Sequence, residues 1–213
     1  MHRTLTAAAV LVASSAGLAA LAGWSAGAEA VPTAAAPTAA RTYAVDTVHS
    51  SLIFSIRHSG LANFYGRFND FRGEINFDES QPTNSTMSFT VRTDSVDTGN
   101  ANRDNHLKNA DFFNSRQFPT IEFTSTSIKP AGEGAYDVTG DLTFHGETRP
   151  VTARLSNVTT GKVRDTDALG FEATFEIKRS DFGMSTYLAP DKGEGGALGN
   201  TVRLIVAVEA AAK

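Results

Sequence analysis

Beyond residue 48, apolar and polar residues alternate along most of the chain, and this period of two restricts the fold more than any other feature. In the first such segment, Leu52, Phe54 and Ile56 alternate with Ser51 and Ser55. The same alternation recurs at 87–91, 121–123, 136–144, 151–155, 169–177 and 202–208. It is typical of half-buried antiparallel strands, whose successive side chains point to opposite faces. The sequence therefore predicts an all-β fold of eight or nine strands.

Short connections between the predicted strands favour a closed barrel over a sandwich. Glycine-containing segments at 132–134, 145–147 and 159–161 suit hairpin turns. Between Phe64 and Phe77 the aromatic residues change parity, which predicts a bulge or a sharp bend. We therefore expect an extended antiparallel barrel of about eight strands.

The segment 100–113 (NANRDNHLKNADFF) interrupts the alternation. Its polar capping residues come first and its apolar residues follow, which predicts a short helix with its linker, inserted into the barrel. Within this segment Arg103, Asp104 and His106 offer a set of charge-assisted hydrogen bonds that could hold the helix on the barrel.

The first forty residues differ in composition from the rest of the chain. His2 and Arg3 begin a short positive segment, and an uncharged run rich in Ala, Leu and Val follows at 5–22. Ala26-Gly27-Ala28 and Ala28-Glu29-Ala30 both place small residues at the spacing of a cleavage site. This layout predicts a secretory signal peptide.

The chain is thus divided into a signal peptide at residues 1–28, a Pro/Ala-rich linker at 29–41 and a β-barrel domain at 42–210. A transmembrane anchor is the alternative for the apolar run, but Ser14 and Ser15 break it and no cationic stop follows. After signal cleavage we expect no permanent membrane anchor, and a periplasmic or secreted protein.

Composition removes several classes of function. The chain has no cysteine, which excludes a disulfide framework, a thiolate nucleophile and a Cys-type zinc finger. Its net charge of -4 lacks the basic footprint of a nucleic-acid-binding protein. We therefore expect no nucleic-acid partner.

All 14 phenylalanines lie beyond residue 50, where they share the apolar strand faces with Gly, Ala and Ser. A barrel of about eight strands encloses either a packed core or room for one small ligand. Rings interleaved with small residues could line an elongated hydrophobic cavity, and a solid Phe-rich core is the alternative. The apolar ligand contacts are predicted to come from the inward stripe, namely Phe54, Ile56, Phe89, Phe123, Leu142, Phe144, Phe171 and Phe175. His58 ends one such stripe and is predicted to meet the polar head group of the ligand at the cavity mouth.

Histidines are the remaining candidates for catalysis or metal binding. His49, His58, His106 and His145 follow the signal peptide, and none stands at H-x-x-x-H spacing or within an H-E-x-x-H motif. We therefore predict no metal site, no cofactor and no enzymatic activity. The alternative is an enzyme or an envelope stress-response factor that uses His49, Asp104 and His106, provided that these three meet around one pocket.

Seven sequence blocks, in order along the chain, carry a likeness to a known family. They are Asp46-x-x-His49-Ser50, Gly66-Arg67-Phe68 to Phe71-x-Gly73, Arg103-Asp104-x-His106-Leu107, Asp111-Phe112-Phe113, Phe118-Pro119-Thr120-Ile121-x-Phe123, Gly140-Asp141-Leu142-Thr143-x-His145-Gly146 and Arg179-Ser180-Asp181-Phe182-Gly183. With these blocks the chain resembles the YceI-like, lipid/polyisoprenoid-binding family over about residues 42–210.

This resemblance implies a lipocalin-like, extended barrel of eight antiparallel strands, often assembled as a homodimer. It also implies that the lumen holds an amphipathic lipid, such as a polyprenyl chain or a fatty-acid amide, without catalysis. We therefore expect an exported protein that binds an isoprenoid or similar long-chain lipid for transport, storage or scavenging. A filled barrel that acts through its surface as a protein-binding module is the other alternative.

Overall fold

The computed structural model describes residues 40–213. The predicted signal peptide at 1–28 lies outside the described residues, and so does the predicted linker at 29–41 except for its last two residues. Arg41, the last of these, already belongs to the first strand. Among the described residues, no helix is long and apolar enough to cross a membrane.

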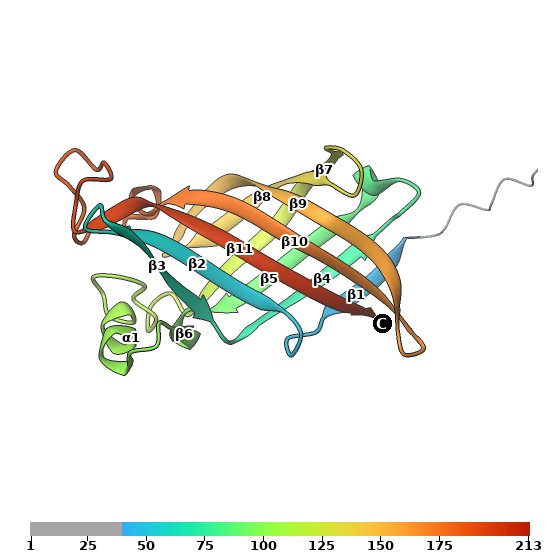
Figure 1. The fold of residues 1–213 in the computed structure, drawn as a ribbon, viewed down its shortest axis with the longest axis horizontal. Coiled ribbons are helices and arrows are strands. Elements are labelled where there is room, and N and C mark those ends of the chain that lie inside the picture. Colours follow the sequence, from blue (N-terminus) through green and yellow to red (C-terminus); the bar gives the residue numbers. More distant parts are fainter. Residues whose placement is uncertain (1–39) are drawn as a thin grey trace, which may run out of the picture. The chain divides into compact units, whose positions relative to one another are not determined.

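Antiparallel strands make up most of the described chain (Figure 1). The eleven strands are β1 (Arg41–Val45), β2 (Ser51–His58), β3 (Ala62–Phe68), β4 (Phe71–Phe77), β5 (Thr86–Arg92), β6 (Val96–Asp97), β7 (Thr120–Pro130), β8 (Tyr136–Phe144), β9 (Glu147–Val163), β10 (Thr166–Lys178) and β11 (Leu198–Ala212). The helical elements are α1 (Ala101–Leu107) and the short 3-10 helices η1 (Pro82–Asn84), η2 (Thr93–Ser95) and η3 (Arg179–Phe182).

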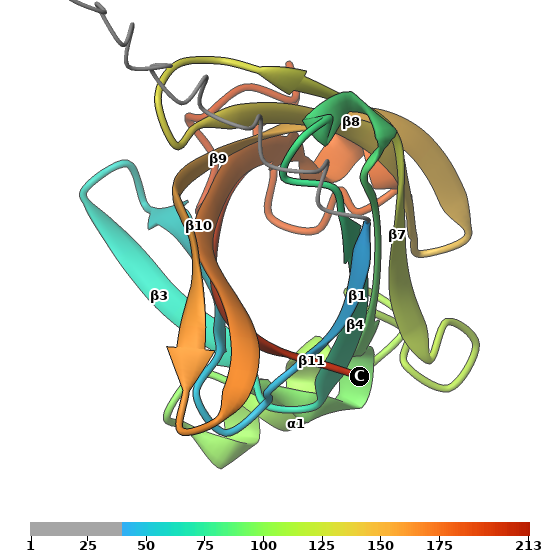
Figure 2. The same ribbon diagram turned by 90° about the vertical axis from the view of Figure 1, so that its right-hand side faces the viewer.

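Eight of the strands form a closed ring, as the sequence predicts. Their order is β1-β4-β5-β7-β8-β9-β10-β11, and the pairing of β1 with β11 closes the ring (Figure 2). β1 pairs with residues 210–212 of β11, while β2 pairs with residues 198–207 of the same strand. β2 therefore continues the position of β1 along the barrel, and β3 and β6 are attached beyond it.

The ring is completed differently where β2 replaces β1. β3 pairs with β6 only at Arg67 and Phe68, so the rest of its outer edge has no strand partner among the described residues. The ring of Phe113, from the segment after α1, lies 5.6 Å from that of Phe68 on β3 and 5.7 Å from that of Phe144 on β8. This segment therefore bridges the two sides of the barrel at the α1 end.

The bend predicted between Phe64 and Phe77 is confirmed. The chain bends at residues 69–70 and passes from β3 to β4, two strands that are not neighbours in the sheet. The predicted helix is also present, and the Asn100 side chain caps α1 by accepting a hydrogen bond from the Arg103 backbone N–H at 3.1 Å.

Two of the three predicted hairpin turns are confirmed, at 132–134 and 145–147, and the third is wrong. Residues 159–161 lie inside β9, with Gly161 paired to Ala168 of β10. The chain reverses instead at Arg164, which takes the positive φ of 55° that a tight turn requires. Gly161 lies within the strand pairing, and its presence there gave a misleading turn signal.

The interior is solidly packed at the end where β1 joins β4 and β11. The side chains that fill it are almost completely buried; they include Ile75, Ala210, Leu169, Val138, Leu155 and Ile128, each no more than 3% exposed. In Figure 1 this end carries the C-terminus, and α1 lies at the opposite end. Most of the packing energy of the barrel is therefore expected at the β1 end.

Replacing Ile75 by Ala should lower the free energy of unfolding by about 2–5 kcal/mol, because the side chain is fully enclosed and leaves a cavity. Ile56→Ala on β2 removes the same atoms from a half-buried position and should cost clearly less. Equilibrium urea unfolding of both variants measures the difference. Equal losses would contradict the assignment of the packed core to the β1 end.

Candidate functional site: an apolar lumen

The other half of the barrel encloses a cavity of about 210 Å³. It extends from Val138, Leu155 and Val206, next to the packed end, to Met184 and Leu198 near α1 and η3. All but three of its 31 lining residues are apolar, the exceptions being Thr98, Arg103 and Arg179. The Phe-rich interior is therefore hollow at this end and solid at the other.

Eight of the nine predicted ligand-contact residues line this lumen. β2 contributes Phe54 and Ile56, and the other strands contribute Phe89, Phe123, Leu142, Phe144, Phe171 and Phe175. The alternation of the sequence places them there, because residues two apart along a strand face the same side. Contact with a ligand remains a prediction for all eight.

His58, the ninth, does not line the lumen. It lies exposed at the last position of β2, opposite Leu198. Its partner Leu198 lines the lumen, so His58 lies near the rim and outside the lining. Its role as head-group contact stays a prediction.

Arg179 is the polar lining residue that sequence reasoning overlooked. It is only 5% exposed, and its three guanidinium nitrogens donate to the backbone carbonyls of Gly199, Thr186 and Leu198 at 2.9, 3.0 and 3.3 Å. Burial lowers the pKa of Arg179. The sequence does indicate that Arg179 faces inward, because it follows Ile177 by two residues and so continues the odd-numbered inward stripe that begins at Leu169.

The carbonyls that Arg179 binds belong to the loop between η3 and β11, residues 183–197, and to the start of β11. Glu194 from this loop accepts backbone hydrogen bonds from Asn200 and Thr201 at 3.1 and 2.8 Å. Desolvation acts to raise the pKa of Glu194, but the hydrogen bonds from Thr201 and Asn200 outweigh it and hold that pKa below its usual value. The loop is thus anchored at both of its ends.

Arg103 and Asp104 fasten α1 to Thr98, which directly follows β6, whereas the sequence suggested that Arg103, Asp104 and His106 hold the helix on the barrel. Arg103 Nε and Nη2 donate to the hydroxyl and carbonyl oxygens of Thr98, both at 2.8 Å. Asp104 accepts from the Thr98 backbone N–H at 2.8 Å. The Arg103 guanidinium also lies 4.3 Å from the centre of the Phe64 ring on β3. Sequence reasoning did not anticipate that Arg103 and the nearby apolar residues Leu107, Phe112 and Phe113 form a wall of the lumen.

The alternative catalytic set is not assembled. His49 pairs with Asp46, Asp104 with Thr98, and His106 with Asp111 at 2.7 Å. None of the three candidate residues His49, Asp104 and His106 lines the lumen. Their common pocket, the condition for that alternative, is absent from the described part of the chain.

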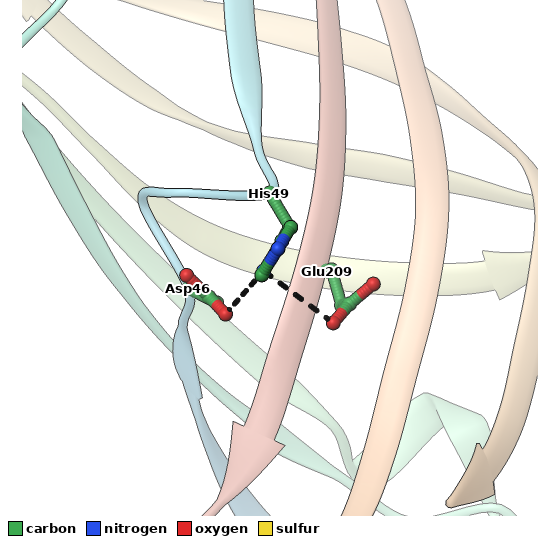
Figure 3. Close-up of side chains that lie close together, drawn as sticks. All are labelled: Asp46, His49 and Glu209. Carbon is green, nitrogen blue, oxygen red and sulfur yellow. Dashed lines mark hydrogen bonds and ion pairs between the residues drawn. The ribbon is translucent and has the colours of Figure 1, made fainter. Parts of the chain in front are cut away.

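A cluster of titratable side chains does form outside the lumen, where the corner between β1 and β2 meets β11 (Figure 3). His49 Nδ1 lies 2.8 Å from Asp46 Oδ2 and 4.0 Å from Glu209 Oε1. The three ligand atoms lie within 4.8 Å of one another, which is the spacing a divalent cation would need. The three side chains join the corner to β11 in this structure, and we call them the clasp.

The clasp is electrostatically coupled. The hydrogen bond and charge of Asp46 raise the pKa of His49, and the hydrogen bond from His49, followed by that from the Val48 backbone, lowers the pKa of Asp46. The same corner is tied by backbone bonds, since the Asp46 N–H donates to the Glu209 carbonyl at 2.8 Å. The cluster therefore positions the strand crossing from β1 to β2.

This clasp predicts a pH-dependent contribution to stability. Because the pKa of His49 is raised above 6.5 on folding, the contribution is complete below that value and is lost as the pH rises through the raised pKa. Because the pKa of Asp46 is lowered from 3.8 on folding, the contribution of the clasp to stability is also lost as the pH falls through that lowered pKa. A double-mutant cycle with His49→Gln and Asp46→Asn, measured by urea unfolding from about pH 5 to about pH 9, should show coupling that fades at high pH. Coupling that stays constant over this range would contradict the assignment.

Sequence comparison identifies relatives along the whole barrel. The YceI-like domain family matches residues 43–210. A UPF0312 protein of Ectopseudomonas mendocina is 40% identical over 173 residues, covering 80% of this chain and 87% of the relative. Protein YceI of Escherichia coli is 42% identical over 164 residues, covering 76% of this chain and 81% of the relative.

Solved structures show the same fold. BcnA of Burkholderia cenocepacia is similar with a TM-score of 0.67 and 25% identity, over 78% of this chain and 98% of that one. A YceI protein of Campylobacter jejuni gives a TM-score of 0.63 with 30% identity, over 74% and 90%. A polyisoprenoid-binding domain from Saccharophagus degradans shares the fold at a TM-score of 0.61 with 16% identity, over 80% and 98%. The chain therefore belongs to the YceI-like family.

Proposed function

We propose that this chain is an exported, non-enzymatic protein that binds an isoprenoid or a similar long-chain amphipathic lipid in its lumen, for transport, storage or scavenging. The observation that carries the proposal is the lumen itself, a cavity with an almost entirely apolar lining inside a closed barrel. The Saccharophagus degradans domain, described as polyisoprenoid-binding, supports it through the shared fold.

Apolar burial alone supplies enough free energy for such a ligand. Each buried CH₂ contributes about 0.8 kcal/mol, and association costs about 4–15 kcal/mol in lost freedom. Between roughly five and twenty buried carbons therefore offset that cost, a range that short polyprenyl or acyl chains cover. No strong polar contact is needed inside the lumen.

The packed β1 end gives the lumen a direction. Ile75 and Ala210 are fully buried there and leave no route through the barrel, so the chain of the ligand enters from the α1 end. The polar head group then stays at the rim, between α1 and the loop at 183–197. Export and a homodimeric state belong to the same proposal and rest on the pattern of residues 1–28 and on the family resemblance.

The direct test is native mass spectrometry of the full chain, purified from a host envelope fraction, followed by organic extraction. The expected result is a mass excess that disappears on extraction and reappears on incubation with a polyprenyl lipid. A ligand-free mass together with no uptake of polyprenyl lipid would overturn the proposal and favour a surface-acting binding module.

Blocking the lumen should abolish uptake without unfolding the barrel. Ala173 on β10 lines the lumen, so Ala173→Phe should reduce uptake of a polyprenyl lipid at least about tenfold by filling the cavity. The adjacent Glu172 is exposed, and Glu172→Phe is the matched control, expected to keep normal uptake. Circular dichroism verifies folding of both variants. Normal uptake by a folded Ala173→Phe variant would place the ligand elsewhere.

A further inference from the structure

Three phenylalanine rings of the lumen lie on glycines of neighbouring strands. Phe54 on β2 is paired directly with Gly66 on β3, and Phe89 on β5 is paired directly with Gly73 on β4. Phe123 on β7 is paired with Leu142, and its ring reaches over Gly140, two residues before Leu142 on β8. Residues paired across antiparallel strands point to the same face, so these glycines face the barrel interior together with the rings.

The contacts are so close that a side chain at any of these positions would have to displace the neighbouring ring. A Cβ built on Gly66 would lie 2.3 Å from Phe54 Cζ, and one on Gly73 would lie 2.7 Å from Phe89 Cδ1. A Cβ on Gly140 would lie 2.5 Å from Phe123 Cζ. The rings therefore occupy the space of the missing side chains and lie against the wall of the barrel, so less of each ring extends toward its axis.

The three glycines lie on different strands. Gly66 is on β3, which lies beside β2 as β4 lies beside β1, so Gly66 and Gly73 are on the same side of the barrel at different positions along it. Gly140 is on β8, three strands further around the ring. Figure 2, which views the barrel from one end, shows β9 and β10 facing β4 and β7 across it. Each ring that lies against its own wall leaves more of the space at the barrel axis open.

We propose that Gly66, Gly73 and Gly140 are specificity-determining residues that set the lumen wide enough for a methyl-branched chain. The inference rests on the proposed lipid-binding function. Dispersion attraction requires contact at about 3.5–4.0 Å, so a chain is held best by a lumen that matches its width. A lumen widened by these glycines fits the side methyls of an isoprenoid, and an unbranched chain makes fewer contacts in it.

Gly66 offers the cleanest test. The three atoms nearest to a Cβ on Gly66 all belong to the Phe54 ring, whereas a Cβ on Gly140 would also meet the Thr124 carbonyl at 2.5 Å. In Gly66→Ala, the ring must move by about 1 Å to reach an ordinary contact of 3.4 Å. Phe68 packs beside Phe54 at 5.6 Å between ring centres, so the open direction is the lumen.

The experiment compares binding of geranylgeraniol with that of the unbranched alcohol of the same main-chain length, by fluorescent-probe displacement. The full-length wild type should prefer geranylgeraniol. Gly66→Ala should weaken geranylgeraniol binding about tenfold and change binding of the unbranched alcohol by less than about threefold. Gly161→Ala on β9 is the matched control, because a Cβ there meets nothing within 4 Å, and it should behave as wild type.

Two further variants keep the proposal testable if Gly66→Ala folds poorly. Phe54→Leu combined with Gly66→Ala should recover the preference for the branched chain, because the displaced ring is gone. Phe54→Leu alone widens the lumen and should increase the ratio of branched to unbranched affinity.

The outcomes separate the two proposals. If neither alcohol binds the wild type, lipid binding itself fails. Lipid binding stands but the role of the glycines is overturned by any of three results. The wild type binds both alcohols with no preference, Gly66→Ala weakens binding of both alcohols equally, or Phe54→Leu lowers the ratio of branched to unbranched affinity.

Discussion

The closure of the barrel depends on strand β11, because two strands pair with one of its edges while β10 pairs with the other. β1 pairs with residues 210–212 of β11, and β2 pairs with residues 198–207. β1 therefore closes the ring of strands at one end of the barrel, and β2 continues it toward the other end, with β10 on the opposite edge of β11. The chain must cross from one to the other within residues 46–50. Asp46, His49 and Ser50 tie that crossing to Glu209, through the side-chain clasp and through backbone hydrogen bonds. This crossing sets the point along β11 at which β2 takes over from β1.

On the two sides of this crossing, the interior of the barrel is packed differently. Toward β1, almost completely buried residues such as Ile75, Leu169 and Ala210 supply dense packing. Toward α1, the interior is left open, and its wall is completed by Phe113 and Leu107 from outside the ring. The two layers overlap, because Val138, Leu155 and Val206 belong to the buried core and also line the lumen. Side chains that face the open space have no partner atoms on that side and contribute less packing energy there.

The period of two in the sequence predicted an all-β barrel of about eight strands and eight lumen residues, since alternation decides which side chains face inward. It predicted eight or nine strands where the structure has eleven, because short strands such as β1 and β6 carry too few residues to show the period. It could not place what depends on pairing between distant segments. Glu209 joins Asp46 and His49 only through the register of β1 on β11. His58 continues the parity of the β2 stripe, yet it is exposed because β2 ends there. Gly161 looked like a turn residue, yet strand pairing continues through it to Arg164. The inward position of Arg179, by contrast, could have been predicted from the sequence, because Arg179 continues the alternation of β10.

The closing pair joins opposite ends of the folded chain, with Tyr43 beside Ala212. A barrel closed in this way cannot be completed until β11 has been synthesised, because β1 at the start of the barrel pairs with that strand. Contacts between such distant segments slow folding, and until they form the strand edges and the apolar interior remain accessible.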